Sequence, residues 1–257
     1  MKEKQHKINS MTKSFLSALV GIAIHKGYIE HEDIPIVSYF KDIDDSKSKI
    51  TIRNLLMMSS GLHFPGNEAM IPSRNWVRFT LDQPMETEPG HLMKYSCGNS
   101  HLLSAILQAA TKVDTVAFAR KYLFEPMGIH DFNWHRDAQG IAIGGFSMTM
   151  KLEDLLKFGI LYLNRGRWKS TQLISEEWVL KSTDARIKAS NGASYGYHWW
   201  VLNDRDIHHS SSRTFYAAGL GGQYIFVHED RRLVTVFTGN YIGDMSRPVD
   251  YYLQYIL

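Results

Sequence analysis

The stretch Ser10-Met-Thr-Lys13-Ser-Phe-Leu-Ser-Ala-Leu-Val-Gly-Ile-Ala-Ile-His-Lys26 decides how the rest of this chain is interpreted. Residues 14–26 are apolar on nearly every side and Gly27 follows them, which predicts a buried helix that ends at the glycine. Ser10 and Lys13 are three residues apart at the start of this helix, so their side chains should lie on the same side of it. A serine beside a lysine is a candidate nucleophile with its base.

The spacing of this serine and lysine is not specific by itself. Ser38-Tyr-Phe-Lys41 and Ser46-Lys-Ser-Lys49 have the same spacing, but both lie in polar stretches that are typical of a solvated surface. Only Ser10 precedes a buried helix. Such a helix holds a nucleophile rigidly and directs its backbone amide and its dipole toward developing negative charge. We therefore interpret Ser10 as the nucleophile.

The composition indicates a globular protein and excludes several classes. The chain has 257 residues, 44% of them hydrophobic, which suffices for one large domain or two small ones. Its 29 basic and 26 acidic residues are scattered, so nucleic acid binding is not indicated. The single cysteine excludes an internal disulfide, and the apolar run 15–24 is too short to span a bilayer. We expect no membrane span and a cytoplasmic location.

The hydrophobic pattern changes along the chain from helical to strand-like. Helices are expected at 52–56, 100–110, 116–124, 151–163 and 175–180. Strands are expected at 195–202, 214–218, 223–228 and 233–239, and Pro248 should open a last helix at 249–257. This order predicts an α/β (α+β) fold. Residues 1–49 and 145–257 would form an antiparallel sheet domain flanked by helices, and 50–144 a mostly helical domain, with the active site between them.

Several segments together resemble the penicillin-recognising family that contains class C β-lactamases, esterases and penicillin-binding proteins. The resemblance runs in order from about residue 8 to the last strand and rests on these segments: Ser10-Met-Thr-Lys13, Ile52-Arg-Asn-Leu-Leu-Met-Met-Ser-Ser-Gly-Leu62, Glu88-Pro-Gly, Tyr95-Ser-Cys-Gly-Asn-Ser100, Gly145-Phe-Ser-Met-Thr149, Asp154-Leu-Leu-Lys-Phe-Gly159 and Tyr195-Gly-Tyr-His-Trp-Trp200. It implies a β-lactamase/transpeptidase-like fold and hydrolysis through an acyl-enzyme on Ser10, with no metal and no organic cofactor. No H-E-x-x-H sequence and no cluster of cysteine and histidine suggests a metal site either.

The resemblance also assigns roles to two further residues. Lys13 would be the base that activates Ser10, and Tyr95 would carry a second proton to the leaving group or from water. To act as a base near neutral pH, Lys13 would need its pKa lowered by about 3 units, which burial could supply. Without the resemblance, a buried tyrosine with a satisfied hydroxyl is the more ordinary interpretation of Tyr95.

A glycine-rich segment takes the place of the family's third motif, a strand with Lys-Thr-Gly or His-x-Gly. The chain has Ala217-Ala-Gly there, so the lysine or histidine is absent. The amides of Ser10 and Leu220 would form the oxyanion hole. The other interpretation of this segment is a glycine-rich hairpin turn. Six residues are expected to contact substrate in this region and near the tyrosine motif: Gly219, Leu220, Gly222, Gln223, Cys97 and Asn99.

The departures from the family pattern bear on the substrate. A lysine or histidine on that strand commonly binds a substrate carboxylate, so Ala217 favours a small ester or amide, as in the branch with 6-aminohexanoate-dimer hydrolase and related esterases. Cys97 stands where many relatives have asparagine, and packing is its expected role. Trp199 and Trp200 should point to opposite faces of a strand, one into the core and the other toward the cleft.

Alternatives remain because only nine residues precede Ser10, whereas relatives have several tens. The outer N-terminal strands are therefore expected to be missing, and the exposed sheet edge could support a homo-oligomer. One alternative is a catalytically inactive family member that binds peptide-like ligands or a partner protein. The other is a penicillin-binding DD-peptidase or β-lactamase. The same expectation implies that an export signal could be missing, which weakens the expected cytoplasmic location.

Overall fold

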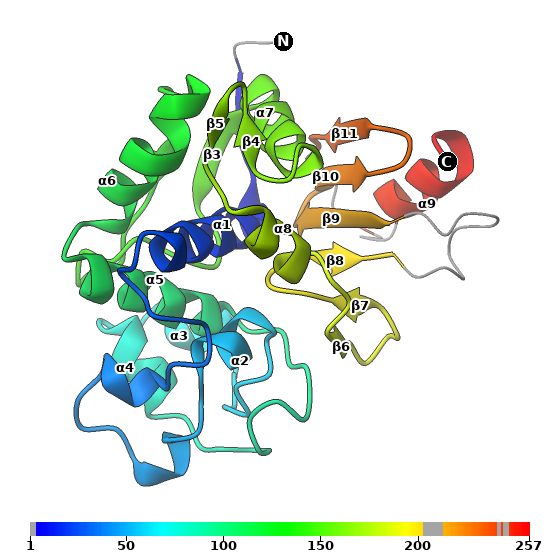
Figure 1. Ribbon diagram of the computed structural model, residues 1–257. Coiled ribbons are helices and arrows are strands. Elements are labelled where there is room, and N and C mark those ends of the chain that lie inside the picture. Colours follow the sequence, from blue (N-terminus) through cyan, green and yellow to red (C-terminus); the bar gives the residue numbers. More distant parts are fainter. Residues whose placement is uncertain (1–3, 203–212, 241–242, 244–246) are drawn as a thin grey trace.

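The main feature of the structure is an antiparallel six-stranded sheet (Figure 1). It is seen in a computed structural model that describes residues 4–202, 213–240, 243 and 247–257. The strand order is β11-β10-β9-β8-β7-β6. The strands are β6 (Ile187–Lys188), β7 (Ser194–Tyr195), β8 (Trp200–Val201), β9 (Thr214–Gly219), β10 (Gln223–His228) and β11 (Leu233–Phe237).

The predicted strand at 195–202 is wrong, whereas the three that follow it are confirmed. Tyr195 pairs with Trp200, so this segment is a hairpin of two short strands, β7 and β8. The chain reverses between them at His198, whose φ is +61°. A left-handed backbone at a residue other than glycine is uncommon, and no glycine or asparagine marks this turn centre in the sequence.

The remaining strands form two smaller sheets. The segment before the nucleophile forms β1 (Gln5–Lys7), which pairs with β3 (Met148–Lys151), and β3 also pairs with β2 (Asn133–Trp134). A separate hairpin consists of β4 (Arg167–Trp168) and β5 (Thr171–Gln172). The few residues before Ser10 are thus tied to a segment more than a hundred residues away, which fixes the start of the central helix.

That central helix, α1 (Thr12–His25), lies between the main sheet and the helical region (Figure 1). Phe15 stacks on Phe158 of α7 (Leu152–Leu163), with ring centroids 3.8 Å apart. Helix α7 covers one face of β10 and β11 closely, because a Cβ at Gly159 would lie 2.4 Å from Val234. On α1 a Cβ at Gly21 would meet the Trp178 ring of α8 (Glu176–Ser182) at 2.3 Å.

The helical region is built from short capped helices around the longer α5. Thr51 and Asn54 form a capping box at the start of α2, and the Ser96 hydroxyl accepts the Asn99 N–H at the start of α5. The helices are α2 (Ile52–Leu56), α3 (Asn67–Met70), α4 (Trp76–Leu81), α5 (Cys97–Thr111) and α6 (Thr115–Ala119). The helical turns are η1 (Asn9–Met11), η2 (Ile36–Ser38), η3 (Asp45–Lys47), η4 (Arg120–Phe124) and η5 (Glu125–Met127).

One hydrophobic core runs through both regions. It includes Leu102 and Phe118 from the helical region and Phe215 and Ile225 from the sheet. The division into two domains therefore stays a prediction. The last helix, α9 (Arg247–Tyr255), covers part of the other face of the sheet, where Tyr252 stacks on Phe226 with centroids 4.1 Å apart.

No single helix in the described part of the chain is both long and apolar enough to cross a membrane. One bent pair, α5 with the helical segment Thr115–Met127, meets that test together by length and composition.

Candidate active site

The turn that carries Ser10 is fixed from two sides. Ser10 lies in η1, directly before α1. On one side the Ile8 N–H donates to the carbonyl of Met148 on β3 at 3.0 Å. On the other side the Asn9 side-chain amide donates to the carbonyl of Leu220, just after β9, at 2.5 Å. The candidate nucleophile is therefore held between the sheet that contains β3 and the end of β9.

Lys13 is buried one helical turn from Ser10 and is surrounded by acceptors. Its Nζ donates to Ser10 Oγ at 3.2 Å and to the Gly145 carbonyl oxygen at 2.6 Å. It also lies 3.5 Å from Cys97 Sγ and 4.7 Å from the centre of the Tyr95 ring. A buried ammonium needs such partners because an isolated charge would be strongly penalised there. The arrangement suits a lysine that handles the proton or the charge of Ser10.

The structure does not support the expected direction of the Lys13 pKa. Burial lowers this pKa, but the electrostatic effects of Tyr95 and Cys97 and their hydrogen bonds raise it, and the net direction is above the usual value. The sequence indicates burial but not these partners. A protonated Lys13 would stabilise negative charge on the oxygen of Tyr95 or Ser10 instead of taking the serine proton alone.

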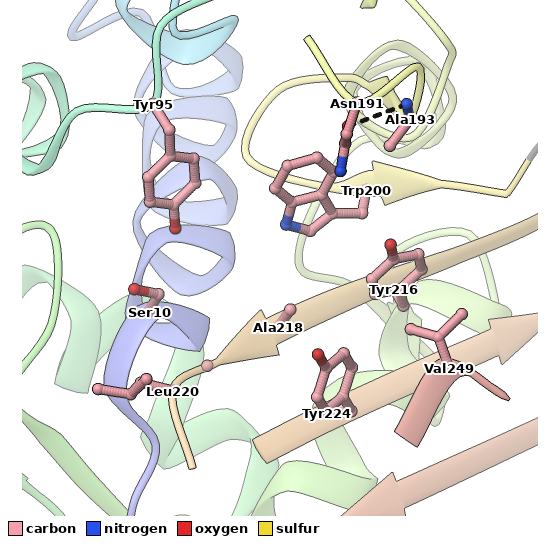
Figure 2. A pocket seen from close by; sticks show the side chains of 11 residues that line it. Ser10, Tyr95, Asn191, Ala193, Trp200, Tyr216, Ala218, Leu220, Tyr224 and Val249 are labelled. Carbon is pink, nitrogen blue, oxygen red and sulfur yellow. Dashed lines mark hydrogen bonds between the residues drawn. The ribbon is translucent and has the colours of Figure 1, made fainter. Parts of the chain in front are cut away.

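Tyr95 lies in the cleft and not in the core. Its side chain is 38% exposed, and its hydroxyl points toward Ser10 (Figure 2). The ring stacks on Trp200 of β8 at 6.1 Å and meets Tyr195 edge-on at 6.4 Å. These contacts hold the ring while the hydroxyl stays accessible to a substrate. The interpretation of Tyr95 as an ordinary buried tyrosine therefore does not apply.

The end of β9 forms the opposite wall of the site. A Cβ at Gly219 would lie 2.2 Å from the carbonyl oxygen of Ile8, so only glycine permits this strand to approach the turn of Ser10. A cavity of about 420 Å³ opens here. Its lining residues are Ser10, Tyr95, Asn191, Ala193, Trp200, Tyr216, Ala218, Gly219, Leu220, Tyr224 and Val249.

Several residues expected to contact substrate lie elsewhere. Gln223 is buried and donates to the carbonyls of Gly221 at 3.0 Å and Gly239 at 2.5 Å, so it braces the glycine-rich turn. Asn99 is buried too and accepts the Ser60 hydroxyl at 2.9 Å. Gly222 does not line the cavity and has a φ of +85°, which suits a glycine in this turn. Cys97 faces Lys13.

Other lining residues were missed or only partly foreseen. Trp199 is fully buried and Trp200 lines the cavity, so one ring is in the core and the other in the cleft as expected, although only Trp200 lies in a strand. Tyr216 and Tyr224 were missed. The signal that could have identified them is the period of two along β9 and β10, which places them on the same face as Trp200. In the described ranges, no group of three or more His, Cys, Asp or Glu side chains could hold a metal ion.

His198 supports the site from behind. Its Nδ1 lies 3.0 Å from the Lys13 carbonyl oxygen and its Nε2 lies 3.4 Å from Ser100 Oγ. Its own carbonyl accepts the Ser14 hydroxyl at 2.7 Å. Burial, and next the charge of Lys13, lower its pKa to about 3. The imidazole is therefore neutral at ordinary pH and links the β7–β8 turn to the first turn of α1.

We expect this histidine to make stability fall with acid. Its folded-state pKa of about 3 is below the ordinary histidine pKa of 6.5, so the stability that the neutral imidazole contributes is complete above pH 6.5 and is lost as the pH falls toward 3. Within that window the free energy of unfolding falls by at most about 1.4 kcal/mol for each pH unit. Urea unfolding at pH 7, 6 and 5 measures it. His198→Asn, which tolerates a left-handed backbone, should show a shallower slope; equal slopes would contradict the assignment.

Comparisons with known proteins identify the family and the fold. The family model described as Beta-lactamase matches residues 2–255. No match was found among curated proteins. Among solved structures, a putative 6-aminohexanoate-dimer hydrolase from Bacillus anthracis has a TM-score of 0.80 at 18% identity, with coverage of 98% of this chain and 72% of that one. An octameric penicillin-binding protein homologue from Pyrococcus abyssi has 0.80 at 19%, covering 98% and 65%.

A third similar structure is the penicillin binding protein from Bacillus halodurans, with a TM-score of 0.79 at 16% identity and coverage of 100% of this chain and 87% of that one. At these identities the likenesses show the fold, which is β-lactamase/transpeptidase-like. The chain spans less than two thirds of the length of the Pyrococcus structure.

Proposed function

This chain belongs to the beta-lactamase family, and from that premise we propose that it is a serine hydrolase that forms an acyl-enzyme on Ser10 with small uncharged carboxylic esters or amides. The observation that carries the proposal is the contact of Lys13 Nζ with Ser10 Oγ at 3.2 Å, at the wall of a cavity into which the Tyr95 hydroxyl points (Figure 2). An inactive binding protein would not need this arrangement.

The proposed reaction has two halves. In the proposed mechanism Tyr95 acts as a phenolate that the Lys13 ammonium stabilises. Ser10 Oγ attacks the carbonyl carbon, and its proton passes to that phenolate, which becomes a neutral phenol. The backbone amides of Ser10 and Leu220 donate to the oxyanion of the tetrahedral intermediate. Tyr95 then returns the proton to the departing alcohol or amine. Water attacks the acyl-enzyme by the same route in reverse, releasing the acid and restoring Ser10.

The wall formed by β9 supports an uncharged substrate. Ala217 is buried in the core and Ala218 lines the cavity, so neither position supplies a cation for a substrate carboxylate. None of the described lining residues is a lysine, arginine, histidine, aspartate or glutamate. Penicillins and peptidoglycan stems are carboxylates, which makes the β-lactamase or DD-peptidase alternative less favoured. Self-association through the sheet edge and a cytoplasmic location stay predictions.

Intact mass spectrometry after incubation with a fluorophosphonate tests the nucleophile. We expect one adduct on the wild-type protein and none on Ser10→Ala. Ser38→Ala is the matched control, because Ser38 also precedes a lysine by three residues but lies on the surface. Parallel incubations with p-nitrophenyl acetate and a penicillin sort esterase from penicillin-binding protein. A folded wild-type protein without any adduct would favour the inactive alternative.

A further inference from the structure

An aromatic ladder extends from the active site across one face of the main sheet. It consists of Trp200 on β8, Tyr216 on β9 and Tyr224 on β10 (Figure 2). Trp200 and Tyr216 are cross-strand partners, with ring centroids 6.4 Å apart and planes 16° from parallel. Tyr216 and Tyr224 follow at 6.0 Å and 30°. Three adjacent strands thus present three rings in one row.

The ladder and the nucleophile share one cavity. Ser10, Tyr95 and the three ladder residues all line it, and Val249 of α9 lines it on the side away from Ser10 (Figure 2). Tyr95 adds a fourth ring because it stacks on Trp200 at 6.1 Å. A volume of about 420 Å³ lies within the ordinary range for small-molecule pockets, roughly 300–1,000 Å³. A group that is bonded to the carbonyl carbon at Ser10 can therefore lie on the ladder.

The lining defines the chemistry of that group. Its polar side-chain groups are the Ser10 hydroxyl, three tyrosine phenols, the Trp200 indole N–H and the Asn191 amide. None of the described lining residues is a lysine, arginine, histidine, aspartate or glutamate. Lys13 is buried behind the Tyr95 ring. An apolar ring gains from contact with aromatic surfaces, whereas a carboxylate would lose hydration without finding a partner charge. The surface fits a flat uncharged group.

The spacing of the rings also defines how such a group binds. A ring inserted between two others needs about 7 Å, twice a carbon–carbon contact of about 3.5 Å. The ladder rings are 6.0 to 6.4 Å apart, so they are already packed on one another. A ligand would lie across the half-buried Trp200 and Tyr216, over the buried Tyr224.

We propose, resting on the hydrolase function above, that the ladder of Trp200, Tyr216 and Tyr224 is the binding site for a flat uncharged aromatic group of the substrate. The preferred substrates are then esters or amides that carry such a group, on either the acyl side or the leaving-group side. This goes beyond the general preference for small uncharged esters, because it names the recognised group and the residues that recognise it.

Three thioesters test the proposal, since the released thiol can be followed with Ellman's reagent. S-ethyl thioacetate is the reference. S-ethyl 3-phenylpropanethioate carries the ring on the acyl side, and S-(2-phenylethyl) thioacetate carries it on the thiol side. We expect kcat/KM for one of the aromatic substrates to exceed the reference by about tenfold or more. In Tyr216→Ala that ratio should fall about tenfold. Tyr255→Ala, a tyrosine of α9 that is 71% exposed, should keep it.

Binding measurements separate this proposal from the hydrolase function. By calorimetry, 2-naphthol should bind the wild-type protein at least tenfold more tightly than 2-naphthoate, and Tyr216→Ala should weaken the naphthol. Turnover of the reference thioester without an aromatic preference, or equal binding of both naphthyl probes, would overturn the proposal that the ladder binds an aromatic group. Neither result would contradict the hydrolase function. Absence of both the fluorophosphonate adduct and thioester turnover, with naphthol still bound, would overturn the hydrolase function alone.

Discussion

Lys13→Met should lower kcat/KM for p-nitrophenyl acetate by about 10⁴-fold or more, because removing one member of a catalytic group that acts as a unit costs about 10⁴- to 10⁶-fold. Methionine has a similar length and no charge. The variant would leave Ser10 Oγ without the ammonium at 3.2 Å and Tyr95 without the cation 4.7 Å from its ring centre. Steady-state kinetics on wild type and variant measures the effect.

The same substitution should lower stability only modestly, by about 1–3 kcal/mol. Methionine removes the hydrogen bond to the Gly145 carbonyl oxygen at 2.6 Å and leaves that carbonyl without this donor, but it also removes the cost of burying a charge. Thermal unfolding of Lys13→Met would then separate lost chemistry from a lost fold. Lys41→Met and Lys49→Met are matched controls, because each lysine follows a serine at the same spacing outside the site. A kcat/KM within tenfold of wild type would remove Lys13 from the mechanism.

Local patterns made the centre of the site predictable. Ser10 and Lys13 are neighbours along the chain, and the apolar run after them indicates the buried helix that holds both. Tyr95 could be assigned only through the resemblance, because 82 residues separate it from Lys13 and spacing along the chain says nothing about that contact. The fold class followed from the change of period after α8, where helical patterns give way to strands.

The remainder depends on contacts that no local pattern encodes. The pKa of Lys13 shifts opposite to our expectation because its neighbours, not burial alone, set it. The β7–β8 turn was missed because a histidine, not a glycine, adopts its left-handed backbone. Gln223 and Asn99 lie near the site in sequence, yet their side chains bond to backbone and to Ser60 instead of facing the cavity.

Gly219→Ala is the second substitution from which we expect a large effect. The added Cβ would lie 2.2 Å from the Ile8 carbonyl oxygen and 3.2 Å from the Gln223 Cβ. The first contact is with backbone, so a strand or a turn must move. Because Ile8 and Asn9 lead directly into Ser10, the shift would separate the nucleophile from the proposed amide of Leu220. We expect kcat/KM for p-nitrophenyl acetate to fall at least about 100-fold.

The loss of stability should be smaller, about 1–3 kcal/mol, because overpacking at one site can be relieved by local movement. Gly128→Ala provides the matched control. Its Cβ would meet nothing within 4 Å, but its φ is +67°, so alanine should cost about 1 kcal/mol without touching the site. The two variants together separate a general loss of stability from a local effect at the site. Both should lose stability in urea unfolding, and only Gly219→Ala should lose turnover. Wild-type turnover in Gly219→Ala would mean that the close approach of β9 to the Ser10 turn has no part in catalysis.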